Sequence, residues 1–392
     1  MQFPQPYSGV PMTTHPVIVK SNSAQAKTYP SRYVAGAETL DRAELRVIAL
    51  GTGYPARRAQ GCAGFLVEVG NGDAFIFDAG AGTNAAFNTL RVPYWKPKFF
   101  ITHYHLDHIG DLPAYYDFGQ SNGRLEPMRV FGPDGLTEDE NIESVVAALK
   151  QFARWHDHSK LGNLDPRGFD IEPHRFTADA PQLIYNEGGV TITSFPVPHG
   201  IYGAVGYRLD YAGLSIVYAG DCEPSTLTVE QAQDVDLLIH EMFNPPQTYV
   251  DFMGWTELQA KIVAWTKHTS PEAAAKVFAA TKPGLAMGYH AIVAPGTPQS
   301  LLDGVRTGYD GPFALAQDYT VVNITPEQIV TRATDIVPWD FIVTDAEYVQ
   351  RMGGVRTDPS LMTGLPDWLE NTTIPVTEIE AFKQQLADMG GR

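Results

Sequence analysis

Short apolar runs alternate with polar turns along most of the chain, which is the pattern of an α/β protein. Each run is about as long as a β-strand, and most end in a glycine turn or directly in a histidine or acidic side chain. The runs lie at 45–55, 64–82, the start of 97–119, 190–200, 214–225, 235–243 and 284–291. A further pair at 313–325 and 328–336 predicts two closing strands.

Local signals predict how two of these segments fold. Asn71 and Gly72 interrupt the apolar run at 64–82, which is typical of a β-hairpin turn. Residues 270–283 predict a helix, because Ser270 is a good N-cap and Pro271 suits the first helical position.

The pattern divides the chain into three parts. Residues 1–44 lack periodicity and predict an extended arm, and 345–392 predict a tail with one helix at 376–389. The body between them, 45–344, carries an insertion near 119–190 that is expected to cover the site like a lid. Because an arm and a tail need a surface to pack against, they suggest a homodimer.

Composition narrows the possible partners. The 392 residues carry a net charge of -17 from 45 acidic and 28 basic side chains. An acidic surface repels phosphate backbones, which argues against nucleic acid and favours a small-molecule substrate. No run approaches the ~18 apolar residues of a membrane span. The N-terminus lacks the features of a signal peptide, so we expect a cytoplasmic protein, or a periplasmic one if a leader preceded this numbering.

Histidine and aspartate recur at the ends of the predicted strands. Strand ends of one sheet can converge, and imidazole and carboxylate groups suit Zn, with Mn or Fe as alternatives. Seven such ligands would serve two divalent ions bridged by Asp221. The set comprises His103, His105, Asp107, His108, His199, Asp221 and His290.

The stretch THYHLDHIGD resembles the His-x-His-x-Asp-His signature of the metallo-β-lactamase superfamily. The resemblance covers roughly 45–330 and implies an αββα sandwich of two mixed sheets flanked by helices. It also implies how the ligands divide between the ions. His103, His105 and His199 would hold one metal, whereas Asp107, His108 and His290 would hold the other, and Asp221 would bridge them.

Two further motifs indicate a branch of that superfamily. DLLIHEMF and HTSPEAAAKVF are similar to motifs of ribonuclease Z and its arylsulfatase-like relatives. By this match Glu241 would orient His268 toward the substrate, Asp107 would act as base, and Asp78 would support a ligand from behind. Candidate pocket walls are Tyr54, Arg57, Trp155, Met242 and Phe243.

The resemblance implies a dinuclear metal-dependent hydrolase that uses a metal-bridging hydroxide. The expected substrate is a small phosphodiester, sulfate ester or carboxylic ester or lactone. Two alternatives remain: a ribonuclease Z-type endoribonuclease and a mononuclear iron dioxygenase. True ribonuclease Z carries a long tRNA-binding arm between the third histidine motif and the bridging aspartate, whereas here only residues 200–220 separate them.

Overall fold

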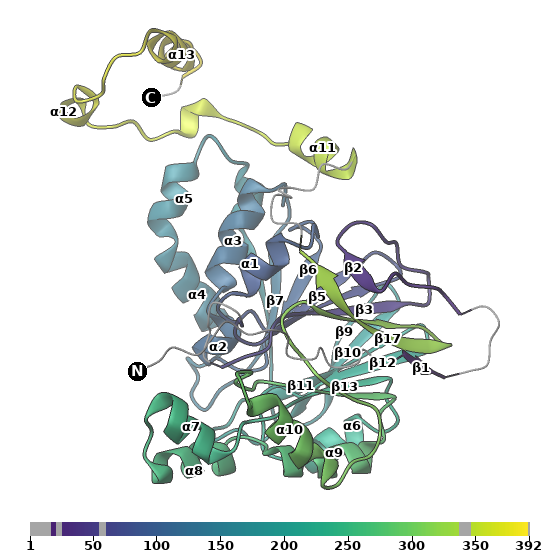
Figure 1. Cartoon of the computed structure of the whole chain (residues 1–392). Helices are drawn as coiled ribbons and strands as arrows, with labels where there is room; N and C mark the ends of the chain where they lie inside the picture. Colours follow the sequence, from purple (N-terminus) through teal and green to yellow (C-terminus); the bar gives the residue numbers. More distant parts are fainter. Residues whose placement is uncertain (1–16, 21–25, 55–59, 337–345, 391–392) are drawn as a thin grey trace, which may run out of the picture.

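Two β-sheets lie face to face between helices (Figure 1). The computed structural model describes residues 17–20, 26–54, 60–336 and 346–390. Within these residues, the ten-stranded sheet has the order β1-β17-β16-β3-β4-β5-β6-β7-β8, with β2 beside β17. Its strands are β1 (Val17–Val19), β2 (Arg32–Val34), β3 (Leu45–Gly51), β4 (Gly64–Val69), β5 (Ala74–Phe77), β6 (Pro97–Phe100), β7 (Met128–Pro133), β8 (Ile171–Phe176), β16 (Thr320–Ile324) and β17 (Gln328–Asp335).

The second sheet has seven described strands in the order β15-β14-β13-β12-β11-β10-β9. Its strands are β9 (Gln182–Glu187), β10 (Val190–Pro196), β11 (Val205–Tyr211), β12 (Leu214–Tyr218), β13 (Leu237–Glu241), β14 (Leu285–Tyr289) and β15 (Phe313–Leu315). Strands β12 to β15 pair in parallel, whereas β9 to β12 pair antiparallel, so the sheet is mixed.

Helices cover the outer face of each sheet (Figure 1). Beside the first sheet lie α1 (Thr83–Asn88), α2 (Leu106–Ile109), α3 (Leu112–Ser121), α4 (Ile142–Phe152), α5 (Arg154–Lys160) and η1 (Pro166–Phe169). Beside the second lie α6 (Thr226–Gln231), α7 (Pro246–Met253), α8 (Glu257–Thr266), α9 (Pro271–Thr281) and α10 (Thr297–Arg306). None of the described helices is both long and apolar enough to cross a lipid bilayer.

The molecule has four layers, two of helices and two of strands, and an apolar core fills each of the three interfaces between them. Alternate side chains of a strand face opposite sides of its sheet, and here both sides are buried. Leu237 and Ile239 of β13 join a core shared with the first sheet, whereas Leu238 joins a core with α9 and α10. Ile48 of β3 faces a third core, toward α1, α3 and α4. The predicted αββα sandwich is therefore confirmed.

The predicted β-hairpin and the two predicted helices are also present. Strands β4 and β5 form an antiparallel hairpin, and Gly72 in its turn has a φ of +94°, a conformation that favours glycine. Helix α9 begins at Pro271, and the Ser270 side chain accepts a hydrogen bond from the Ala273 N–H. The helix predicted in the tail is α13 (Thr377–Asp388).

The segment 119–190 is built differently from the lid that we expected. Most of it extends the two sheets, because β7 and β8 join the first and β9 joins the second. Helices α4 and α5 lie on the outer face of the first sheet (Figure 1). From this segment, Gly135 and Glu140 of the loop between β7 and α4 line a cavity beside His105 and His199. Hydrogen bonding along the sheet edges, which the hydrophobic pattern does not reveal, decides this placement.

The buried carboxylate of Glu44 ties the N-terminal segment to the first sheet. It accepts hydrogen bonds from the Lys27 ammonium, the Tyr29 hydroxyl, the Asn323 amide and the backbone N–H of Asp41. Burial acts to raise the pKa of Glu44, but these donors together hold it below its usual value. The segment before β3 is thus anchored by these polar contacts, together with the burial of Tyr33 and Ala35 in an apolar core.

The tail beyond 345 starts against the segments that cover the first sheet and then extends away from the sandwich (Figure 1). It contains α11 (Ala346–Gly353), η2 (Pro359–Leu361), α12 (Asp367–Glu370) and α13, and none of its α-helices has a buried residue. Helix α11 contacts the body through a hydrogen bond from Trp95 Nε1 to Glu347 and an ion pair between Arg351 and Glu126. The division into arm, catalytic domain and tail stays a prediction.

Candidate metal centre

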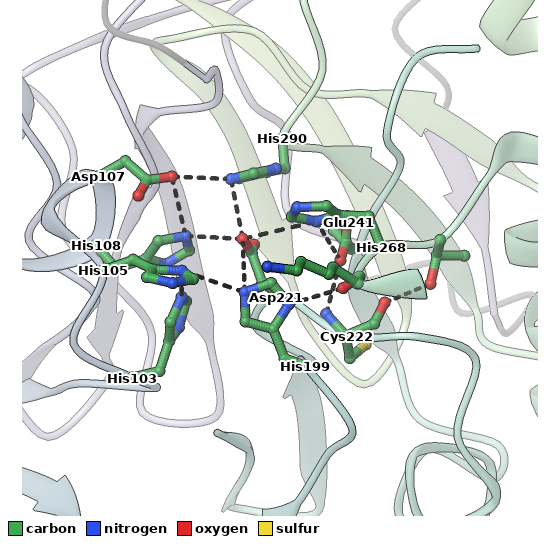
Figure 2. Close-up of polar contacts among 12 residues, drawn as sticks. His103, His105, Asp107, His108, His199, Asp221, Cys222, Glu241, His268 and His290 are labelled. Atoms are coloured by element: carbon green, nitrogen blue, oxygen red, sulfur yellow. Dashed lines mark hydrogen bonds and ion pairs between the residues drawn. The ribbon is translucent and has the colours of Figure 1, made fainter. Parts of the chain in front are cut away.

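Three of the predicted ligands meet where loops leave the two sheets (Figure 2). His103 and His105 follow β6, and His199 follows β10. The Nε2 atom of His103 lies 2.9 Å from His105 Nδ1, and His199 Nε2 lies 3.2 Å from the same atom. Three imidazole nitrogens therefore point at one another, which is the arrangement of a site for a cation.

The other four predicted ligands form a second group beside the first (Figure 2). Asp221 Oδ2 lies 3.2 Å from both His108 Nε2 and His290 Nε2. Asp107 Oδ2 lies 3.2 Å from His290 Nε2 and 3.5 Å from His108 Nε2. Because Asp221 Oδ2 is also 3.9 Å from His199 Nε2, this carboxylate stands between the two groups.

The donor atoms fit divalent ions. In each group, one ligand atom from every residue lies within 4.8 Å of the others. Among the residues that the structure describes, the buried atoms His108 Nε2 and Asp221 Oδ1 find no hydrogen-bond partner. Buried polar atoms normally have a hydrogen-bond partner. A bound metal ion would account for these two atoms, because it would take the place of that partner.

The charges of the cluster also suit a cation. Burial lowers the pKa of His103, and it lowers the pKa of His199 to about 4, so both rings are neutral at neutral pH and keep a lone pair for a metal. Burial acts to lower the pKa of His108 as well, but the carboxylates of Asp221, Asp78 and Asp107 hold it well above its usual value. This excess of negative charge favours any cation at the site.

Asp78, which we expected to support a ligand from behind, contacts the candidate ligand His108. It follows β5 with a φ of +59°, and its carboxylate bonds to His108 Nδ1 at 2.7 Å. It also accepts hydrogen bonds from the Thr102 N–H and hydroxyl and from the Tyr218 hydroxyl, each at 2.8 Å. A carboxylate that accepts the Nδ1 proton leaves Nε2 of His108 free to bind a metal.

Glu241 and His268 form a pair at the edge of the cluster (Figure 2). His268 Nδ1 lies 3.0 Å from both carboxylate oxygens of Glu241, at the end of β13. Burial raises the pKa of Glu241, while the N–H of Cys222, which donates to Oε1 at 2.6 Å, acts in the opposite direction. Phe243 stacks on the His268 ring with centroids 4.1 Å apart and a 7° tilt. The imidazole is thus held from two sides.

The predicted pocket residues have different positions. Tyr54 lines the cavity and stacks on His290 at 5.6 Å. Met242 and Phe243 are fully buried and line neither cavity; Phe243 packs behind His268, whereas Met242 belongs to the core under α9 and α10. Trp155 is not at the site: it is 81% exposed on α5 and lines a separate hollow beside the tail. Arg57 lies outside the described residues.

The cavity over the cluster contains residues that the sequence analysis missed. It has a volume of about 360 Å³ and is lined by ligands together with Trp255, Gln259, Val263 and Lys267 of the α8 region. A second cavity of about 260 Å³ opens on the β7–α4 side, and His105 and His199 line both. The four-residue spacing of the α8 side chains was visible in the sequence, but which face they present was not.

Sequence comparison identifies the family. The beta-lactamase superfamily domain matches residues 75–291, which span the His103–His108 motif, Asp221 and His290. The chain belongs to this superfamily, and with its sandwich fold and ligand cluster it is a metallo-β-lactamase fold hydrolase. This fold implies binding of divalent metal.

Individual relatives indicate the branch. The ribonuclease Z of Methanosarcina mazei is 25% identical over 246 residues, which cover 54% of this chain and 78% of the relative. The fold of the short form of human tRNase Z matches with a TM-score of 0.53 and 20% identity, covering 70% of this chain and 98% of that one. The metallo-beta-lactamase fold protein YhfI from Bacillus subtilis matches with a TM-score of 0.52 and 18% identity, covering 72% and 100%. The chain is therefore a ribonuclease Z-like metal-dependent hydrolase of ester bonds.

These relatives overturn one expectation. The prediction that nucleic acid would not be a partner is wrong, because curated relatives carry the name ribonuclease Z. The net charge of -17 is an average over the whole surface. Binding depends instead on the local potential, which falls off within about 8 Å at physiological ionic strength.

Proposed function

We propose that this protein is a ribonuclease Z-type phosphodiesterase that hydrolyses a phosphodiester bond in RNA. The observation that carries the proposal is the Glu241–His268 pair beside the ligand cluster, in a chain whose relatives are named ribonuclease Z. The seven predicted ligands would hold two divalent ions, with zinc as the first candidate because imidazole and carboxylate suit it.

The reaction adds water across a phosphorus–oxygen bond. The water oxygen bonds to phosphorus, the bond to the leaving oxygen breaks, and a proton passes to that oxygen. When bound, the two ions would supply Lewis acidity and lower the pKa of a water molecule. Asp107, at the open side of the cluster, would accept the proton of the attacking water.

In its doubly protonated form, His268 would provide the proton for the leaving oxygen from Nε2, and it would regain that proton from solvent. Its Nδ1 atom is engaged by Glu241, which fixes the ring so that Nε2 is the atom available to the substrate. A general acid of this kind typically contributes about 10²–10⁴-fold to the rate. Phe243 would keep the ring in this orientation, because it stacks on the imidazole face.

The test compares cleavage of a labelled transfer RNA transcript with flanking nucleotides by wild type, His268→Ala and His158→Ala. His158 is an exposed histidine on α5 and serves as the matched control. We expect cleavage by wild type and His158→Ala, a loss of at least about 100-fold in His268→Ala, and about two zinc ions per chain. An absence of cleavage by the metal-loaded wild type contradicts the proposal.

One observation favours a second candidate, hydrolysis of a smaller phosphodiester, sulfate ester or carboxylic ester. Strands β11 and β12 join through Ala212 and Gly213 alone, where the resemblance to ribonuclease Z places a tRNA-binding arm. Turnover of bis(p-nitrophenyl) phosphate, p-nitrophenyl sulfate or p-nitrophenyl acetate without RNA cleavage would favour this candidate.

A further inference from the structure

Helix α8 and the residues that flank it present four side chains to the cavity over the candidate ligands. Trp255, Gln259, Val263 and Lys267 all line it, and each is four positions from the next. Gln259 and Val263 share one face of α8 because they lie four positions apart, whereas Trp255 precedes the helix and Lys267 follows it as the C-cap. Together these four side chains form one wall of the cavity. Lys267 also contacts a candidate ligand through its backbone, because its carbonyl accepts a hydrogen bond from His199 Nδ1 at 2.7 Å.

The Lys267 side chain lies over the loop that carries His199. A Cβ atom added at Gly200 would lie 3.4 Å from both Cδ and Cε of Lys267, so the aliphatic stem crosses this glycine at van der Waals distance. Gly200 has a φ of +68°, a conformation that a side chain would strain. The stem of Lys267 therefore lies next to the loop that carries His199.

Lys267 brings positive charge to an otherwise acidic site. Among the described residues that line this cavity it is the single lysine or arginine. Within the described ranges, no carboxylate lies within ion-pair distance of its ammonium, which leaves the charge available to a ligand.

We propose that Lys267 binds a non-bridging oxygen of the substrate and thereby selects for an anionic ester, such as a phosphodiester, over a neutral one. The inference rests on the proposed function, because it names the feature of the substrate that this same site recognises. An ammonium group binds a phosphate oxygen as a point charge and needs little geometric precision. The flexible end of a lysine beside the ligands suits that role.

The test measures binding separately from cleavage. A short fluorescein-labelled single-stranded RNA is titrated with metal-free protein in the presence of a chelator, and anisotropy is recorded over a range of salt concentrations. The variants are Lys267→Met, which keeps the length of the stem, Lys267→Arg, which keeps the charge, and Lys261→Met. Lys261 is an exposed lysine of α8 that pairs with Glu257 and does not line the cavity.

We expect Lys267→Met to weaken RNA binding about 10- to 100-fold, the range of one charge-assisted hydrogen bond. The dependence of log K on log salt should become shallower by about 0.7, which corresponds to one phosphate contact on a single strand. Lys267→Arg should retain most of the affinity, and Lys261→Met should behave like wild type.

A parallel assay compares kcat/KM for bis(p-nitrophenyl) phosphate, an anion, with that for p-nitrophenyl acetate, a neutral ester. Loss of activity in Lys267→Met should be confined to the anion. Equal affinity and equal salt dependence of Lys267→Met and Lys261→Met would overturn the inference, as would a wild type that does not bind the RNA. A wild type that binds RNA through Lys267 but cleaves none would instead contradict the proposed function and leave the inference standing.

Discussion

Replacing Asp78 by asparagine tests whether a buried carboxylate sets the proton position on a ligand histidine. One carboxylate oxygen, Oδ2, accepts hydrogen bonds from the Thr102 hydroxyl, the Tyr218 hydroxyl and His108 Nδ1, and Oδ1 accepts one from the Thr102 N–H. An amide offers one oxygen and two N–H donors. If the amide nitrogen takes the place of Oδ1, its N–H groups face the backbone N–H of Thr102. If it takes the place of Oδ2, they face Nδ1 of His108. In either orientation two donors face each other, and neither partner can rotate away.

The expected magnitude follows from these contacts. A buried donor without a partner costs about 1–3 kcal/mol, so one or two such groups lower the free energy of unfolding by about 2–4 kcal/mol. His108 can relieve the conflict by moving its proton from Nδ1 to Nε2, but Nε2 is then no longer a metal ligand. We expect zinc affinity to fall about 10- to 100-fold, the range for loss of such a supporting partner.

Urea unfolding in chelator measures the first effect, and competition against a zinc-binding dye measures the second. Tyr218→Phe is the control, because it removes one of the four donors and leaves the carboxylate in place. It should cost about 1 kcal/mol and change zinc affinity little. If Asp78→Asn has the same free energy of unfolding and the same zinc affinity as wild type, the hydrogen bonds to Asp78 do not hold the site together.

Three further outcomes are expected. The folded-state pKa of Glu44 lies below its usual value of about 4.5, so its contribution to stability is present above that pH and is lost as the pH falls through the folded pKa. The stability difference between wild type and Glu44→Gln should therefore be largest at pH 7 in urea titrations and shrink below pH ~4.5, and a difference that grew in acid would contradict this. Phe100→Ala should lower the free energy of unfolding by about 3–5 kcal/mol, because Phe100 is fully buried between the sheets and stacks on Phe131 at 4.5 Å; an unchanged urea midpoint would count against this core. In Gly80→Ala the new Cβ would lie 2.0 Å from the Asp107 carbonyl oxygen, so the loop that carries Asp107 must shift. Zinc affinity, measured by dye competition, should therefore fall. An affinity equal to that of wild type would show that the loop can accommodate the methyl group.

Much of the fold could be predicted from the sequence because it depends on local signals. The strands before each ligand were apolar runs, the β4–β5 turn was marked by Asn71-Gly72, and α9 was marked by Ser270 and Pro271. The four polar side chains between His103 and His108 were also conspicuous directly after a buried strand. Such features are encoded within a few neighbouring residues, so periodicity and spacing reveal them.

Other features depend on which segments pair across the molecule. The run at 313–325 was predicted as one strand, but β15 joins the second sheet and β16 the first, because the chain crosses between layers at Gln317–Tyr319. The segment 119–190 extends both sheets rather than covering the site. Long-range hydrogen bonding decides both placements, and the hydrophobic pattern is compatible with either arrangement.

The residue types of the candidate ligands, their order along the chain and the apolar runs that precede them could all be read from the sequence alone. By contrast, the stacking of Phe243 on His268 and the position of Lys267 in the cavity wall became visible only in the folded protein. The physical reason is that these contacts join residues from different elements, so their geometry depends on how the two sheets pack. A residue's chemistry is fixed by its side chain, but what that chemistry acts on is fixed by its neighbours in space.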